Sequence, residues 1–136
     1  MPKKYTIIST QEDIKLRVFG ADKSELFRHA ALGMLEILKP SADERTAVER
    51  KITVEADDDE NLLLEFLNEA LSQMRLNKEC YREFELRFKN ENKLEAVLKG
   101  FKLMGFGGEL KRGDYCDLRI FRNEKGVLEC EVVFNI

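Results

Sequence analysis

The sequence predicts an α+β fold, in which a mixed or antiparallel β-sheet is covered by two amphipathic helices, in the order ββαβα followed by four strands. Two observations support this prediction. Apolar residues recur at helical spacing in two separate segments, and apolar and polar residues alternate with a period of two in most of the remaining chain. Four of the expected strands come after the second helix, which favours an α+β arrangement over alternating βαβ units.

The first expected elements are two strands and a helix. Residues 5–9 and 13–19 are rich in β-branched and aromatic side chains, which is typical of strands. Asp22 and Glu25 then form a capping box, and apolar residues recur at helical spacing until a proline stops the run. We therefore expect a helix over about residues 23–38.

A strand and a second helix follow. After a polar loop, residues 51–55 alternate as a strand, and the acidic run 57–60 leads into apolar residues at helical spacing from Leu63 to Met74. Carboxylates at a helix N-terminus cap free amides and complement the macrodipole. We therefore interpret the acidic run as a helix start rather than as a metal cluster.

From residue 82 onward the period changes to two, which predicts a meander of four strands. The segment 123–126 is typical of a tight turn that pairs Asn123 with Val127. Extended along both strands, that register sets Asp114 opposite Ile136. The same register predicts four further pairs: Arg119 with Glu131, Ile120 with Cys130, Leu118 with Val132, and Cys116 with Phe134.

The predicted core lies where the helices meet the sheet, and it consists of Leu26, Phe27, Met34, Leu67, Leu71, Leu118, Val132 and Phe134. The three cysteines are odd in number and widely spaced, without a CxxC pair that would suggest zinc or redox chemistry. We therefore expect no disulfide among Cys80, Cys116 and Cys130.

Length and charge narrow the class of protein. The 136 residues fit one domain, so we expect a single domain over residues 1–136. A net charge of −3 argues against a protein that holds nucleic acid mainly by neutralising phosphates. No run approaches the ~20 apolar residues of a membrane helix, and the first residues lack the apolar stretch of a signal peptide. A cytoplasmic location is expected.

The sequence offers little catalytic machinery. His29 is the only histidine and is expected to be solvent-exposed, so no histidine-based triad or two-histidine metal site can be assembled. The segment 105–108 lacks the phosphate-loop pattern and is expected to be a flexible connection between strands. An enzyme whose site is assembled from scattered carboxylates stays open as an alternative.

Five segments carry a family resemblance: residues 10–14 before a strand, residues 24–33 in the first helix, residues 62–71 in the second helix, the segment 109–115, and residues 132–136. Together they resemble the archease family. The likeness spans nearly the whole chain, and the segments occur in the order of the family.

The resemblance implies an accessory protein for the GTP-dependent RNA ligase of tRNA splicing, one that promotes guanylylation of the ligase and its turnover. It also implies a divalent cation, calcium, bound through Asp13, Asn135 and Ile136. Asp13 begins one expected strand and Asn135 and Ile136 end another, so antiparallel pairing of these strands would bring them together. The predicted register sets Asp114 opposite the α-carboxylate of Ile136, and a cation between the two carboxylates would relieve their repulsion. We therefore add Asp114 to the expected site. Glu109 and Lys111 fall on a family segment and are expected on the surface that meets the ligase.

The sequence also departs from the family, at residues 100–101, in the segment 111–114, and at three positions that bear on the expected cation site. The family's histidines fall on Thr10 and Cys116, and its closing aspartate falls on Asn135. Asparagine keeps an oxygen donor but removes a charge, so calcium binding is expected to be weak. The alternative is a diverged binding module that keeps the fold but lacks the metal and the ligase-activating role. Direct contact with nucleic acid is left open.

Overall fold

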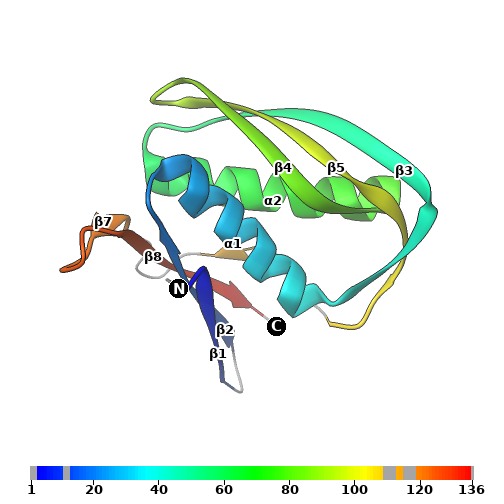
Figure 1. Ribbon diagram of the computed structural model, residues 1–136, viewed down its shortest axis with the longest axis horizontal. Helices are drawn as coiled ribbons and strands as arrows, with labels where there is room; N and C mark the ends of the chain where they lie inside the picture. Colours follow the sequence, from blue (N-terminus) through cyan, green and yellow to red (C-terminus); the bar gives the residue numbers. More distant parts are fainter. Residues whose placement is uncertain (1–2, 11–12, 109–112, 115–118, 136) are drawn as a thin grey trace.

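The computed structural model describes residues 3–10, 13–108, 113–114 and 119–135, and in it both helices lie between two antiparallel sheets (Figure 1). The first sheet contains β1 (Tyr5–Ser9), β2 (Asp13–Gly20) and β8 (Leu128–Asn135), with the short strands β6 (Gly113–Asp114) and β7 (Phe121–Arg122) both paired with β8. The second sheet contains β3 (Pro40–Glu55), β5 (Lys93–Phe106) and β4 (Glu79–Asn90) in that order. The helices are α1 (Lys23–Leu38) and α2 (Asp59–Asn77).

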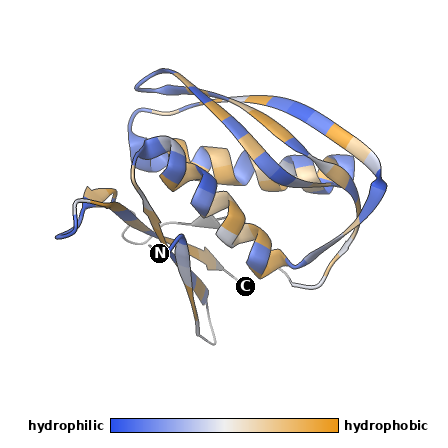
Figure 2. Cartoon of the chain, viewed as in Figure 1, coloured by the Kyte–Doolittle hydropathy of each residue, from blue (hydrophilic) through white to orange (hydrophobic). Residues whose placement is uncertain are grey.

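The predicted α+β class is confirmed, and the late strands differ from a single meander. β4 and β5 pair with β3 to form one sheet, whereas β8 pairs with β2 in the other. The physical reason is that apolar residues of the two helices pack against both sheets, one on either side of the helical layer. Apolar residues interleave with polar ones along α1 and α2 (Figure 2), and the buried residues of both helices form one core with buried residues of both sheets. Each sheet thus covers one side of the helical layer.

Both helices begin at the predicted caps. The Asp22 carboxylate accepts a hydrogen bond from the Glu25 amide at 2.8 Å, and the Asp58 carboxylate accepts one from the Asn61 amide at 2.7 Å. The acidic run therefore starts a helix, as predicted. The ion pair of Lys23 with Asp59, at 3.0 Å, joins the first turns of the two helices.

A cluster of aromatic rings joins the helices to the second sheet. Phe27 of α1 stacks with Phe66 of α2 at 6.0 Å between ring centroids, and it meets Phe88 of β4 edge-on at 5.3 Å. Seven of the eight predicted core residues are buried, and Leu118 lies outside the described residues. Cys80 and Cys130 are buried free thiols, as predicted, while Cys116 is also outside the described part.

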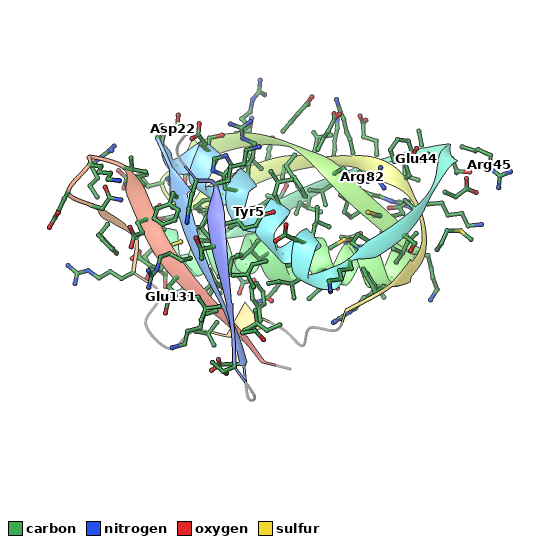
Figure 3. All side chains as sticks on the ribbon, turned by 60° about the horizontal axis from the view of Figure 1, so that its bottom comes forward. Tyr5, Asp22, Glu44, Arg45, Arg82 and Glu131 are labelled. Atoms are coloured by element: carbon green, nitrogen blue, oxygen red, sulfur yellow. The ribbon has the colours of Figure 1, made fainter. Side chains whose placement is uncertain are left out.

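The predicted polar loop before residue 51 is wrong, because β3 already begins at Pro40. β3 is an edge strand of the second sheet, so its charged side chains face solvent and keep the pattern polar. Two irregularities, one between Ser41 and Ala42 and one between Asp43 and Ala47, interrupt its pairing with β5. Figure 3 shows Glu44 and Arg82 at the same end of this sheet, and they form an ion pair at 2.7 Å.

The predicted turn at residues 123–126 is confirmed, but its register does not extend along the strand. Gly126 has a positive φ of 76°, and Phe121 pairs with Glu129, as the turn requires. Asp114, however, pairs with Val133 instead of Ile136. The registers of β6 and β7 along β8 differ by three residues, so the two short strands do not form one continuous ladder.

The remaining predicted pairs of this hairpin have different outcomes. Glu131 makes its ion pair with Arg17 of β2, at 3.2 Å, and not with Arg119, which is exposed and outside any strand. The pairs predicted for Cys116 and Leu118 lie outside the described residues. Ile120 is half-buried against the core but lies in no strand.

The glycine-rich segment after β5 contacts the end of α1 rather than forming a free connection. The amides of Gly107 and Gly108 donate hydrogen bonds of 2.9 Å to the carbonyls of Lys39 and Leu38. These carbonyls are among those that a helix end leaves without an intrahelical partner. A side chain at Gly108 would clash with the Ile37 carbonyl, so this close approach requires glycine.

The burial of Leu67 predicts a large effect of truncation. Leu67 is 0% exposed, so Leu67→Ala is expected to lower the free energy of unfolding by about 2–5 kcal/mol. Leu76 of the same helix is 75% exposed and provides the control, because Leu76→Ala should change stability by no more than about 0.5 kcal/mol. Equal effects in urea denaturation would show that the facing of α2 is wrong.

Candidate functional site

The pairing of β2 with β8 brings an early and a late segment of the chain together. Their ladder is antiparallel and runs from Asp13 opposite Asn135 to Gly20 opposite Leu128. The juxtaposition of Asp13 with Asn135 that the sequence predicts is therefore present. Their binding of a cation stays a prediction.

The other predicted site residues have different outcomes. Glu109, Lys111 and Ile136 lie outside the described residues. Asp114 is on β6, on the opposite side of β8 from β2, and it pairs with Val133, two residues along β8 from Asn135. The predicted pairing of Asp114 with Ile136 is wrong because of the register shift in this strand.

Thr10, the residue that follows β1, holds the Asp13 carboxylate in place. The Thr10 hydroxyl lies 2.8 Å from Asp13 Oδ1 and accepts a hydrogen bond from the Asp13 amide at 3.0 Å. The Thr10 amide donates to the Asp13 carbonyl at 2.9 Å, which continues the β1–β2 ladder by one pair. Thr10 therefore orients Asp13, and the carboxylate keeps further lone pairs for a ligand.

The chemistry of these donors agrees with a hard cation. A carboxylate at Asp13 and an amide oxygen at Asn135 are oxygen ligands, which calcium prefers. Calcium takes about six to eight of them, and the described residues contain no group of three or more His, Cys, Asp or Glu side chains that could hold a metal. The described part of the site thus supplies the right type of ligand but only a portion of a full set.

The single histidine is not solvent-exposed, contrary to the prediction. His29 is half-buried, and its Nδ1 lies 2.6 Å from the carbonyl of Phe19. α1 packs against β2 at this position, so the imidazole links the helix to the strand. The contact gives His29 a structural role in the packing of these two elements.

A second polar cluster, which was not predicted, consists of Arg50 of β3 and Glu79 and Tyr81 of β4. Glu79 is only 6% exposed, and its carboxylate accepts two hydrogen bonds from Arg50, at 2.9 and 3.2 Å, and one from the Tyr81 hydroxyl at 2.6 Å. Arg50 and Glu79 belong to the two edge strands, so their ion pair crosses the middle strand β5. Pairing across a strand leaves no periodic signal in the sequence.

The electrostatics of this cluster are those of a satisfied structural pair. Burial alone would raise the pKa of Glu79, but the hydrogen bonds from Arg50 and Tyr81 and the charge of Arg50 outweigh it, and the pKa is lowered. Burial, together with the hydrogen bond to Glu79, raises the pKa of Tyr81. Both oxygens of the Glu79 carboxylate have partners within the fold, as is typical of a structural ion pair.

The outer face of the second sheet carries ion pairs that neutralise one another. Lys99 lies 2.7 Å from Glu85 and 4.0 Å from Glu49, on the two neighbouring strands. The hydrogen bond to Glu85 is the main reason that the pKa of Lys99 is raised. A hollow of about 650 Å³ lies at one end of this sheet, lined by residues 55–57 and 90–93, and does not include Asp13.

No helix in the described part of the chain is long and apolar enough to cross a membrane.

Comparison with known proteins shows one consistent similarity. The model of the Archease protein family (MTH1598/TM1083) matches residues 5–136. The protein archease of Methanosarcina barkeri is 28% identical over 142 residues, covering 98% of this chain and 97% of that protein. The protein archease of Pyrococcus abyssi is 30% identical over 91 residues, covering 67% of this chain and 60% of that protein.

Two solved structures share the fold. The crystal structure of an archease from Thermotoga maritima has a TM-score of 0.70 and 21% identity, covering 100% of this chain and 98% of that one. The solution structure of protein 1598 from Methanobacterium thermoautotrophicum has a TM-score of 0.62 and 20% identity, covering 98% of this chain and 99% of that one.

The Glu79 cluster predicts a pH-dependent contribution to stability. Because the folded pKa of Glu79 is lowered, its stabilisation is present above the unfolded value of about 4.3 and is lost as the pH falls through the folded value. Glu79→Gln should therefore cost about 1–3 kcal/mol at pH 7 and clearly less near pH 3. Urea denaturation at both pH values measures this, with the exposed Glu91→Gln as control. A cost that is the same at both pH values would contradict it.

Proposed function

Because the chain belongs to the archease family, we propose that it is an accessory protein that activates the GTP-dependent RNA ligase of tRNA splicing. In this role it promotes guanylylation of the ligase and its repeated turnover, and the ligase itself joins the RNA. The observation that best supports the proposal is the family match over residues 5–136, which includes both ends of the β2–β8 ladder and hence the Asp13 site.

The proposed mechanism is positioning without a covalent intermediate. Asp13 and Asn135, together with Ile136, would hold calcium, which would supply positive charge next to the ligase. Thr10 fixes the Asp13 carboxylate through its hydroxyl, so the site is oriented before a partner arrives. We propose that Glu109 and Lys111 lie on the surface that contacts the ligase. Orientation of reacting groups alone can contribute several kcal/mol to a rate.

A second candidate is a binding module that keeps the fold but neither binds the metal nor activates the ligase. Asn135 favours it, because the family's closing aspartate would carry a charge that asparagine lacks. Affinity purification from the source cell separates the two candidates, since recovery of the RNA ligase counts against the second.

Activation of the ligase is tested by guanylylation. Adding the chain to the ligase of the same organism, with GTP, should increase the rate of ligase–guanylate formation. Asp13→Asn should reduce this increase, because it removes the charge but retains an oxygen that accepts the Thr10 hydroxyl. Asp57→Asn, at an exposed residue outside the β2–β8 ladder, is the matched control. No change in rate on adding the unmodified chain would refute ligase activation.

Calcium binding is tested separately by calorimetric titration. We expect a dissociation constant of roughly 10⁻⁴–10⁻³ M, the range of weak sites. Asn135→Asp should strengthen binding because it adds a charged ligand, and Asp13→Ala should abolish it. Absence of heat and of any rise in melting temperature at about 10 mM calcium would exclude the site. Equal binding by both variants and the unmodified chain would locate the cation elsewhere.

A further inference from the structure

The edges of the two sheets differ in how they are protected against pairing with another strand. β3 and β4, the edges of the second sheet, carry many charged residues and register irregularities along their ladders with β5. β6 and β7 each contain two residues. β1 has the sequence Tyr-Thr-Ile-Ile-Ser, without a charge or a proline, and its ladder with β2 is regular over all five pairs. β1 is thus the least protected edge in the described part of the molecule.

The hydrogen-bond pattern shows which backbone groups of β1 face outward. The Phe19 amide donates to the Lys4 carbonyl, and the Thr10 amide donates to the Asp13 carbonyl. In an antiparallel ladder hydrogen-bonded residues alternate, so Thr6 and Ile8 also bond to β2. The amides and carbonyls of Tyr5, Ile7 and Ser9 therefore point to the open edge, where no described strand pairs with them.

We propose that β1 pairs antiparallel with β1 of a second copy of this chain, with Ile7 opposite Ile7 at the two-fold axis. This register places Tyr5 opposite Ser9 of the second copy, and Ser9 opposite its Tyr5. All the outward-facing groups of β1 are then used, because each of these pairs exchanges both of its hydrogen bonds. A register centred on Tyr5 or on Ser9 would leave some of them without a partner.

Side chains on the face away from the helices agree with this register. Ile8 is 37% exposed, and in the pair it lies opposite Thr6 of the second copy, which covers it. Lys4, which is exposed, lies opposite Thr10 of the second copy. The Thr10 hydroxyl is hydrogen-bonded to the Asp13 carboxylate, so each lysine approaches a carboxylate of the other copy. The charges at the two ends of the paired strands are therefore complementary.

The other face of β1 is already held in place. Tyr5 extends toward α1 (Figure 3), where burial and the charge of Glu36 raise the pKa of its hydroxyl. Ile7 packs against the core. The edge is therefore ordered before pairing, which reduces the entropy lost on association. A strand of five residues buries little surface, so the dimer should be weak and concentration-dependent.

Sedimentation velocity over a range of concentrations tests the dimer. The unmodified chain should shift from monomer to dimer as its concentration rises. Ile8→Lys, which places a charge on the edge, and Ser9→Pro, which removes an outward-facing amide, should each raise the dissociation constant about tenfold or more. Met104→Lys is the control, because Met104 is 65% exposed on β5 of the other sheet, and it should leave the constant unchanged.

Disulfide cross-linking tests the register itself. In the proposed register, Thr6 of one copy and Ile8 of the other form a non-hydrogen-bonded pair. Their Cα atoms would be about 4.5 Å apart, within the reach of a disulfide. A mixture of Thr6→Cys and Ile8→Cys chains should therefore cross-link on oxidation. Each variant alone should cross-link poorly, since identical positions are about 7–8 Å apart on the diagonal. The unmodified chain controls for its own cysteines.

Three results would overturn the proposal. They are a monomer at every concentration, a dimer that is insensitive to both Ile8→Lys and Ser9→Pro, and cross-linking of a single variant as efficient as that of the mixture. If the chain is monomeric and the ligase protects the Ile7 amide from hydrogen exchange, the edge belongs to a strand of that partner instead of to a second copy.

Discussion

The antiparallel pairing of β2 with β8 is the constraint on which the rest of the molecule depends. It joins residues 13–20 to residues 128–135, which are separated by more than a hundred positions, over an unbroken ladder. Leu16 and Val132 face each other in that ladder and are fully buried beneath the helical layer. The same ladder ends at Asp13 and Asn135, so the pairing that closes the core also assembles the candidate site. Loop-closure entropy makes such a distant contact costly, and burial of its apolar face offsets that cost.

The helical layer explains why the two sheets have different surfaces. Each sheet buries one face on α1 and α2, and its other face meets solvent (Figure 2). On the second sheet that outer face carries mutually neutralising charges, as Lys99 does between Glu85 and Glu49. On the first sheet it carries Asp13, Arg17 and the exposed Ile8. The proposed site and the unprotected edge thus belong to the same sheet, which contains both β1 and β8 (Figure 1).

Local signals made much of the fold predictable from the sequence. The bounds of α1 followed from the Asp22 cap and the proline after it, and the last turn followed from Gly126. Longer-range features left no such signal. Residues 41–50 are mostly polar and mostly exposed along the edge strand β3, so they resembled a loop. The ion pair of Arg50 with Glu79 crosses the middle strand β5. The shift that moves Asp114 to Val133 falls between the two-residue strands β6 and β7.

The position of the candidate site was partly predictable from the order of the strands. A strand that begins with Asp13 and one that ends with Asn135 must meet when the strands pair antiparallel, and they do. The claim that a cation binds at this junction is tested most directly by following backbone amide resonances during a calcium titration. The account predicts saturable shifts that cluster at Asp13 and at residues 133–135. Shifts confined to the hollow at residues 55–57 and 90–93, or no shifts at all, would contradict it.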